Sequence, residues 1–495
     1  MNPEPRLFSI PTFSRDMKKD SFLQRFLNLF RYEGKLDPIL LGLCLFINLI
    51  VLINAIFQHP KIGYDVGQNL IYIQILPDRL PSQNDTYEFF SPPLPYFLPS
   101  RFDILCEHTH STRLSMYNGS EVSNVCRTYD GKFAQGINVL LSIGTTLLLL
   151  MVAGQIKPGN RFFKISALMM LALLTVYYKT FSQVRGEPYV VFFIVLSIYL
   201  INETLKTTTL DTKLILATGI SLGLLVLSRQ WGFFIFPAIF LLIIWIFIQN
   251  RQTGWLRARQ FFLIALVSAM IGGWFYIHLY LDYGTFSAFN IKQPTYPSTE
   301  ETLTFFRQTE LQNLKLFQKP VRPVFDHQSF FAIMYSETWG DYWGYFTFIK
   351  PGSARDNIGN QAVIAPYLGE VNLASVLPSL LLFAGLVFGL IQVFQPGKPP
   401  TLERTSLVFI TLLALSTIFG YLWFIYRYFA QNNLVIKATY IIQFFIALLF
   451  LYAGFMEAVR KKSQWVYNLI LILLAVVLIH NLPAMITRYN MFPGF

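Results

Sequence analysis

The sequence predicts an all-α, polytopic membrane protein. Of its 495 residues, 54% are hydrophobic and 13% are charged, whereas a soluble domain carries about 25% charged residues. Several windows hold the ~20 consecutive apolar residues that a helix needs to cross a bilayer. These runs are continuous and lack the period-two alternation of barrel strands, which argues against a transmembrane β-barrel.

Eleven apolar segments have the composition of transmembrane helices. They cover residues 38–57, 134–154, 162–181, 189–203, 213–228, 232–248, 260–281, 372–393, 405–426, 437–456 and 465–482. The fourth, fifth and sixth segments are short for a bilayer, so we expect them to tilt little, to extend into flanking residues or to line a cavity.

The distribution of basic residues predicts the orientation of the chain. The net charge is +12, and Lys and Arg are concentrated in the short connectors of one side. The positive-inside rule makes that side cytoplasmic, and it explains the charge without nucleic acid as a partner. With eleven spans, the N-terminus lies inside and the C-terminus outside. The connector residues are Lys157, Arg161, Lys164, Lys206, Lys213, Arg251, Arg257, Arg259, Arg460, Lys461 and Lys462.

This topology divides the chain into four parts. Residues 1–37 form a cytoplasmic segment, in which DSFLQRFLNLFRYEGK has apolar residues at helical spacing and predicts an amphipathic helix on the inner leaflet. Residues 38–281 form a transmembrane module with a first long outer loop, 58–133. Residues 282–371 form a second long outer loop, and residues 372–495 hold the C-terminal transmembrane helices. Long ordered loops often carry function, so we expect the site, and with it the catalytic part of the 38–281 module, at these loops.

The first outer loop opens with an aspartate in front of a predicted helix over residues 65–76. Asp65 is followed three residues later by Gln68, which has the form of a capping box. Capping of the helix is therefore one interpretation of Asp65. The other interpretation is that the loop presents this carboxylate to a ligand.

Two cysteines bracket the last part of the same loop. Cys106 and Cys126 both fall on the predicted outer side, where a disulfide is the ordinary outcome. A zinc site with His108 and His110 is the alternative, although the spacing fits no standard zinc pattern.

Ionisable residues collect at the predicted outer membrane boundary, where isolated charges are costly. Each has a structural alternative: Arg229 beside Trp231 has the form of a snorkelling arginine, and Arg185 and Glu187 can pair with each other at a turn. The candidates are Asp65, Glu88, Arg185, Glu187, Arg229, Glu337 and Asp341.

A sugar phosphate carried on a polyprenol would place its reactive bond where these residues gather. Displacement of the phosphate by a hydroxyl needs a carboxylate to accept the proton. It also needs cationic groups or a divalent metal to stabilise the leaving phosphate, and arginine binds phosphate oxygens in a bidentate manner. Neither GxxxxGK[ST] nor GxGxxG occurs in the chain, so no nucleotide-binding motif is indicated.

Several motifs resemble the GT-C superfamily of membrane glycosyltransferases, which includes protein O-mannosyltransferases and bacterial aminoarabinose transferases. In many members the first loop has an aspartate that opens a helix, then LP, then an acidic residue before PPLYY. The matching pieces here are Asp65, RLP at 79–81, Glu88 and SPPLPYF at 91–97. The segments LGLLVLSRQWGFFIFPAIFLL and IKATYIIQF resemble two later motifs. Two departures are Val66, where a second acidic residue is usual, and Ala438–Thr439, where a basic residue is common and Lys437 lies nearby.

The resemblance implies a GT-C-type bundle of about eleven helices that transfers a hexosyl or pentosyl group. The donor would be a polyprenyl-phosphate sugar and the acceptor a hydroxyl of a glycan, lipid or protein, with inversion, at the extracytoplasmic face of a bacterial inner membrane or its equivalent. Asp65 would be the base, Arg229 a phosphate contact, and Glu88 a contact to the acceptor or to a metal. A divalent metal such as Mg²⁺ or Mn²⁺, held by Asp65 and Glu88, is left open. The remaining residues expected to line the cavity are Arg185, Glu187, Glu337, Asp341 and Lys437.

Two other functions fit parts of the pattern. A transporter or flippase for lipid-linked saccharides would use outer charges along a pathway, and it predicts ionisable residues deep inside the spans. A non-catalytic scaffold would need Asp65 for capping alone.

Overall fold

The computed structural model describes residues 27–110, 124–289, 298, 316–322, 330–347, 361–395, 400–428 and 435–488. Within these ranges the protein is a bundle of helices, and its strands are the short pair β1 (Arg31–Tyr32) and β2 (Lys35–Leu36). The predicted all-α polytopic fold is confirmed.

Each of the eleven predicted spans corresponds to helical structure. Nine helices of the described chain are long and apolar enough to cross a bilayer; α6 and α7 together form a tenth candidate, bent by 65°, and α9 is a shorter apolar helix. The elements are α2 (Pro38–Phe57), α5 (Asn124–Ile156), α6 (Arg161–Leu173), α7 (Thr175–Ser182), α8 (Glu187–Lys206), α9 (Thr212–Ser228), η1 (Gln230–Phe234) with α10 (Ile235–Gln249), α11 (Arg251–Tyr283), α14 (Gln361–Ala374) with α15 (Val376–Phe394), α16 (Leu402–Arg427), η5 (Ala438–Ile441) with α18 (Ile442–Lys462), and α19 (Gln464–Asn481) with η6 (Leu482–Met485).

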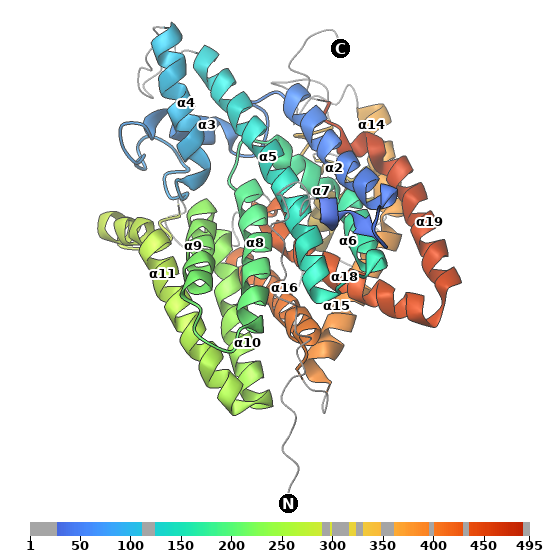
Figure 1. Cartoon of the computed structure of the whole chain (residues 1–495). Helices are drawn as coiled ribbons and strands as arrows, with labels where there is room; N and C mark the ends of the chain where they lie inside the picture. Colours follow the sequence, from blue (N-terminus) through green and yellow to red (C-terminus); the bar gives the residue numbers. More distant parts are fainter. Residues whose placement is uncertain are drawn as a thin grey trace, which may run out of the picture.

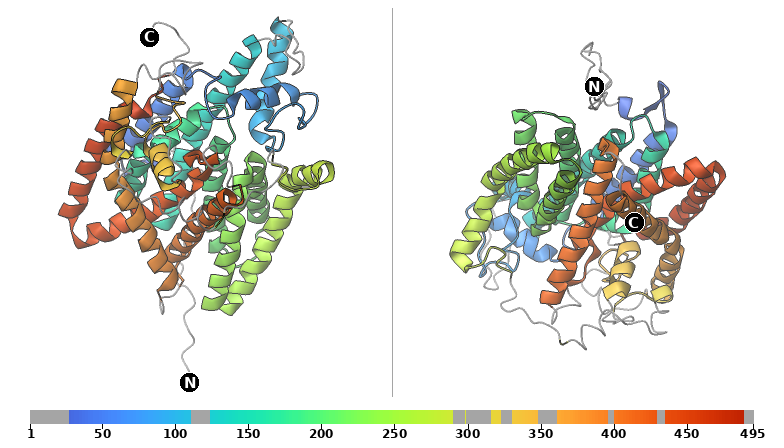
Figure 2. Two further views of the ribbon diagram at one scale, coloured as in Figure 1. Left: turned by 180° about the vertical axis from the view of Figure 1, so that it is seen from behind. Right: turned by 90° about the horizontal axis from the view of Figure 1, so that it is seen from below.

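The helices divide into two groups around a central one. Figure 1 shows α9, α10 and α11 at one side and α2 and α19 at the other, and both views in Figure 2 keep this separation. Helix α18 packs against α6, α15 and α16. The apolar stretch of the span that contains α18 is 83% buried inside the protein, whereas that of the span that contains α19 is 28% buried. Helix α18 therefore forms the core, whereas α19 turns apolar side chains outward, as a helix that faces lipid does.

Polar side chains form hydrogen bonds with the unpaired backbone N–H and C=O groups at many helix ends. Leaving such groups unpaired is most costly in apolar surroundings. The Asp37 carboxylate accepts hydrogen bonds from the amides of Ile39 (3.0 Å) and Leu40 (3.4 Å) at the start of α2. Side chains cap the starts of α6, α9, α11, α16 and α19 in the same way, from Asn160, Asp211, Asn250, Thr401 and Ser463. Cations donate to carbonyl oxygens at the ends of α2, α8 and α15, from Lys132, Arg257 and Arg404.

The first long loop contributes two helices at one end of the bundle, α3 (Val66–Ile75) and α4 (Leu94–His110), drawn at the upper left of Figure 1. A disulfide joins Cys106 in α4 to Cys126 in α5, with Cα atoms 5.8 Å apart. The pairing leaves neither thiol for a zinc site. Helix α3 is fixed to the α7–α8 connector because Asn69 Nδ2 donates to the Val184 carbonyl (2.8 Å).

The prediction of one amphipathic helix through residue 35 is wrong at its end. Residues 31–36 form the β1–β2 hairpin, with Arg31 opposite Leu36. Glu33 and Gly34 have φ values of 50° and 79°, and a two-residue hairpin turn of type I′ requires positive φ at both positions. Residues 1–26 of the predicted N-terminal segment lie outside the described residues.

Candidate active site

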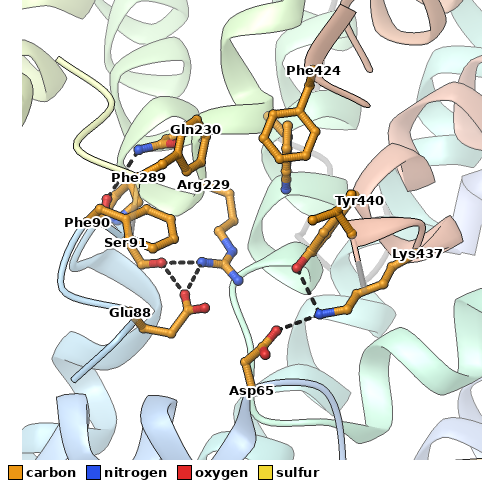
Figure 3. A pocket seen from close by; sticks show the side chains of 13 residues that line it. Asp65, Glu88, Phe90, Ser91, Arg229, Gln230, Phe289, Phe424, Lys437 and Tyr440 are labelled. Carbon is orange, nitrogen blue, oxygen red and sulfur yellow. Dashed lines mark hydrogen bonds and ion pairs between the residues drawn. The ribbon is translucent and has the colours of Figure 1, made fainter. Parts of the chain in front are cut away.

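A cavity of about 210 Å³ lies where the first loop meets residues next to α9, α16 and α18. Four of the predicted site residues, from distant parts of the sequence, line it: Asp65, Glu88, Arg229 and Lys437. Figure 3 shows Arg229 and Lys437 facing each other from two sides, with Asp65 near both. The rest of the wall is largely aromatic and consists of Phe90, Ser91, Pro92, Gln230, Trp231, Phe289, Phe424, Val435 and Tyr440.

Asp65 directly precedes α3 but does not cap it, so the capping-box interpretation is wrong. Its backbone is left-handed (φ 56°, ψ 12°), and its side chain makes no hydrogen bond to the first turn. Gln68 is used elsewhere, because its Oε1 accepts hydrogen bonds from the Thr86 hydroxyl (2.9 Å) and the Tyr87 amide (3.1 Å). The Asp65 carboxylate lies in the cavity wall instead, where Oδ2 accepts a hydrogen bond from Lys437 Nζ at 2.8 Å.

Lys437 reaches Asp65 from an extended segment just before η5 (φ −135°, ψ 120°). Its amide donates to the Tyr421 hydroxyl of α16 (3.0 Å), which fixes the backbone. Its Nζ also donates to the Tyr440 hydroxyl (3.1 Å). The side chains of Lys437 and Asp65 are 11% and 36% exposed, so the ion pair lies at the surface of the cavity.

The ion pair holds both groups in their charged forms. Burial alone would raise the pKa of Asp65, but Lys437, together with Arg185 and Arg229, outweighs burial and lowers this pKa to about 2. Burial alone would lower the pKa of Lys437, but the Asp65 carboxylate outweighs burial and raises it. In the free protein Asp65 is therefore ionised but a weak base, because a low pKa means a weak drive to take up a proton.

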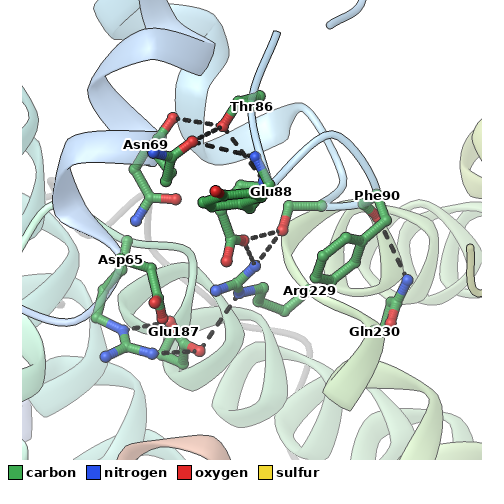
Figure 4. A network of polar contacts seen from close by, with 12 residues as sticks. Asp65, Asn69, Thr86, Glu88, Phe90, Glu187, Arg229 and Gln230 are labelled. Carbon is green, nitrogen blue, oxygen red and sulfur yellow. Dashed lines mark hydrogen bonds and ion pairs between the residues drawn. The ribbon is translucent and has the colours of Figure 1, made fainter. Parts of the chain in front are cut away.

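Arg229 occupies the junction between α9 and η1 in an extended conformation (φ −165°, ψ 154°). Its Nη1 donates to Glu88 Oε2 (2.6 Å) and to the Ser91 hydroxyl, and that hydroxyl in turn donates to Glu88. Its Nε donates to Glu187 Oε1 (3.3 Å). Figure 4 shows this network of contacts from close by. Within the described residues the hydrogen bonds of Arg229 use Nε and Nη1, and its side chain lines the cavity.

Arg185 and Glu187 lie behind Arg229 rather than in the cavity wall. Arg185 Nε and Nη2 donate to the two carboxylate oxygens of Glu187 at 2.5 and 2.8 Å, and both side chains are buried. Gly186 permits the close approach of the two segments, because a Cβ here would lie 2.5 Å from the Ser228 carbonyl oxygen and 2.9 Å from Arg229 Cγ. Glu187 therefore orients the Arg229 side chain through its bond to Arg229 Nε, from the side away from the cavity.

Two predicted lining residues of the second loop do not lie in the cavity wall. Glu337 in α13 (Phe330–Trp339) is fully buried and pairs with Lys179 at 2.7 Å. Asp341 is also buried, and its carboxylate holds the following turn by accepting hydrogen bonds from the amides of Tyr345, Phe346 and Thr347.

Sequence reasoning missed two tyrosines, Tyr64 and Tyr440, that lie between Arg185 and Lys437. The rings of Tyr64 and Tyr440 each contact Arg185 (5.3 and 5.5 Å) and Lys437 (5.1 and 5.2 Å), within the range of a cation–π interaction. The position of Tyr64 beside the candidate base was the available signal. Lys179, a charge inside the predicted span 162–181, was also overlooked.

The carboxylates of the cavity do not fit a divalent metal site. Each of the two in the wall, Asp65 and Glu88, already pairs with a cation. Across the described ranges, no three or more His, Cys, Asp or Glu side chains are placed to hold a metal ion. Val66, at the position of the usual second acidic residue, is 1% exposed and packs in the apolar cluster of the first loop.

Fold and site together define a class: a polytopic membrane protein with an aromatic cavity that presents cations and a carboxylate near one end of its helices. Such a cavity suits an anionic head group attached to an apolar chain. Residues 123–282 match the family model of dolichyl-phosphate-mannose-protein mannosyltransferases, a family of the GT-C superfamily. The match confirms the predicted resemblance to this superfamily and indicates a membrane glycosyltransferase with a polyprenyl-phosphate sugar donor.

The matched segment runs from α5 into α11 and contains Arg185, Glu187 and Arg229. Asp65 and Lys437 lie outside it, so their assignment depends on the geometry of the cavity. No curated protein matches the chain.

Proposed function

We propose that the protein transfers a sugar from a polyprenyl-phosphate donor to an acceptor hydroxyl at the extracytoplasmic face of the membrane. The similarity to dolichyl-phosphate-mannose-protein mannosyltransferases favours mannose as the sugar and a protein as the acceptor. The observation that carries the proposal is the placement of Arg229 and Lys437 on facing walls of a cavity that also presents Asp65.

The three side chains divide the reaction between them. Arg229 and Lys437 bind the donor phosphate. The Asp65 carboxylate takes the proton of the acceptor hydroxyl while the hydroxyl oxygen forms a bond to the anomeric carbon. The bond from that carbon to the phosphate oxygen breaks with its electron pair on the phosphate, whose additional negative charge the two cations stabilise. Attack from the opposite face inverts the anomeric carbon without a covalent intermediate.

Donor binding would also strengthen the base. Lys437 holds the pKa of Asp65 low in the free protein. A phosphate that draws Lys437 away from the carboxylate removes that cause, so the pKa of Asp65 rises towards a value better suited to proton transfer. The same two cations take the part that a divalent metal would have, and we propose that transfer does not need one.

The transporter alternative predicted ionisable residues inside the spans. Lys179 in α7 is such a residue, but it is paired with Glu337 and does not line the cavity. The scaffold alternative depended on capping by Asp65, and Asp65 does not cap α3. Both observations favour the transferase.

The test is sugar transfer by the full chain in detergent, from dolichyl-phosphate [³H]mannose to a serine-rich peptide. Asp65→Asn should lower the rate by about 100-fold or more, the scale of general-base catalysis. Asp85→Asn is the matched control, because Asp85 lies in the same loop and pairs with the exposed Arg79 (2.6 Å) rather than with a cavity residue. Arg229→Gln should raise the KM for donor more than Arg229→Lys. A wild-type rate for Asp65→Asn would refute the base assignment, and equal KM values for the two Arg229 variants would remove the phosphate role.

A further inference from the structure

The backbone of Asp65 needs support from outside its own helix. A residue with a Cβ is disfavoured in the left-handed region, although Asp less than most residues, and such conformations persist where the surroundings enforce them. Asp65 has φ 56°. Its carbonyl accepts hydrogen bonds from the Gln68 and Asn69 amides in the first turn of α3, but its side chain makes no bond to that helix. The orientation of the carboxylate therefore depends on contacts from outside α3.

The neighbouring Tyr64 has the contacts to do so. Its side chain is buried, and its amide donates to Gln183 Oε1 (3.3 Å). Its ring lies against the cations of Arg185 and Lys437, and it meets the Tyr345 ring edge-on at 5.1 Å. Tyr64 is thus held by residues of three separate segments: the α7–α8 connector, the residue before η5 and the second loop.

The Tyr64 hydroxyl adds a further attachment to the second loop, at α13. It donates a hydrogen bond to Glu337 Oε1 in α13. The same oxygen accepts from Lys179 Nζ at 2.7 Å, and Lys179 also donates to the Glu337 carbonyl at 2.6 Å. Lys179 belongs to α7, beyond the 65° bend from α6. A buried ion pair therefore ties the second loop and the bent span to the residue before Asp65.

We infer that Tyr64 is a positioning residue, which fixes the Asp65 carboxylate in the cavity through its hydroxyl bond to the buried Glu337–Lys179 pair. The inference rests on the proposed role of Asp65. It gives Glu337 a part in transfer without contact to substrate, which explains why this residue is buried away from the cavity.

Tyr64→Phe removes the hydroxyl and keeps the ring against both cations. Because phosphate binding is retained while the base loses its fixed position, kcat should fall about 10- to 100-fold, the scale of a small misplacement, with the KM for dolichyl-phosphate mannose within about twofold of wild type. Tyr335→Phe is the matched control. Tyr335 lies in α13, the helix of Glu337, and donates its hydroxyl hydrogen bond to the Asn372 carbonyl (2.8 Å), away from the cavity, so the kcat of this variant should stay unchanged. An unchanged kcat for Tyr64→Phe, or equal losses in the two variants, would overturn the inference.

A pair of double variants tests the acceptor for the hydroxyl without leaving a buried charge unpaired. Lys179→Met/Glu337→Gln keeps a side-chain oxygen opposite Tyr64, whereas Lys179→Met/Glu337→Leu has none. The first should retain most of the wild-type kcat and the second should behave like Tyr64→Phe. Equal kcat values for the two double variants would contradict the positioning role.

Hydrogen exchange separates this inference from the proposed function. The amides of Gln68 and Asn69 donate to the Asp65 carbonyl, both at 3.0 Å, and so report on the backbone of Asp65. Their exchange should be about tenfold faster in Tyr64→Phe and unchanged in Tyr335→Phe. If the wild type transfers no sugar but exchange is faster in Tyr64→Phe, the proposed function is refuted and the positioning role of Tyr64 is supported. Unchanged exchange in Tyr64→Phe would overturn the positioning role whatever the activity.

Discussion

Replacement of Asp65 by Asn, Ala or Gly separates the backbone of this residue from its charge. All three variants lose the ion pair with Lys437 and the base. They differ at φ 56°, where Asn and Gly are tolerated and Ala meets a steric cost of about 1 kcal/mol or more. We therefore expect Asp65→Ala to be less stable than Asp65→Asn by about 1 kcal/mol, with Asp65→Gly close to the Asn variant. In a chain of this size, that difference corresponds to roughly 2 °C in Tm or less.

Thermal unfolding in detergent and transfer from dolichyl-phosphate mannose, measured on the same preparations, check both parts. All three variants should transfer sugar about 100-fold more slowly, or worse, because none carries a carboxylate. Equal Tm values for Ala and Asn would refute the argument from the left-handed backbone. Recovery of activity in any of the three would refute the argument from the carboxylate. The two outcomes are independent.

Three further predictions follow from contacts of the same site. Gly186→Ala should push Arg229 aside, because its Cβ would meet the Ser228 carbonyl oxygen at 2.5 Å; we expect about tenfold lower kcat/KM, and wild-type kinetics would contradict the packing. The Asp65 pKa is lowered from 3.8 to about 2 and the Lys437 pKa is raised above 10.5. The stabilisation by their ion pair is therefore complete between about pH 5 and 9, lost as the pH falls through the lowered value and lost again as it rises through the raised one; the Tm difference between wild type and Asp65→Asn should be constant in that window and shrink below about pH 4. EDTA should leave the transfer rate unchanged, and inhibition that Mg²⁺ or Mn²⁺ reverses would show that a metal takes part.

The helices could be predicted from the sequence because their signal is local. Twenty apolar residues in a row have few alternatives to a membrane-spanning helix, and the span 38–57 coincides with α2. The bend between α6 and α7 could not be predicted. Residues 162–181 read as one apolar run, and the break at Leu174 (φ −74°, ψ 95°) carries no proline or glycine signal.

The site was predictable as a group and not in its internal arrangement. Asp65, Glu88 and Arg229 could be selected because charges at a membrane boundary are costly and need a reason. Capping of α3 by Asp65 was a sound local inference, yet Gln68 turned out to hold the segment at Thr86 instead. The sequence indicated only weakly that Lys437 belongs to the site, because its partner Asp65 lies far away in the chain.

What the sequence by itself determined is therefore the helical membrane class and the identity of most of the charged residues at one boundary. Tertiary structure alone decided which of these charges meet: Lys437 reaches Asp65 across 372 positions of the chain, and Lys179 reaches Glu337 across 158. The physical reason is range. Helix formation depends on residues within a few turns of one another. The pairing of buried charges depends instead on which segments the packed bundle brings into contact, so Glu337 bonds to Tyr64 and Lys179 and does not line the cavity.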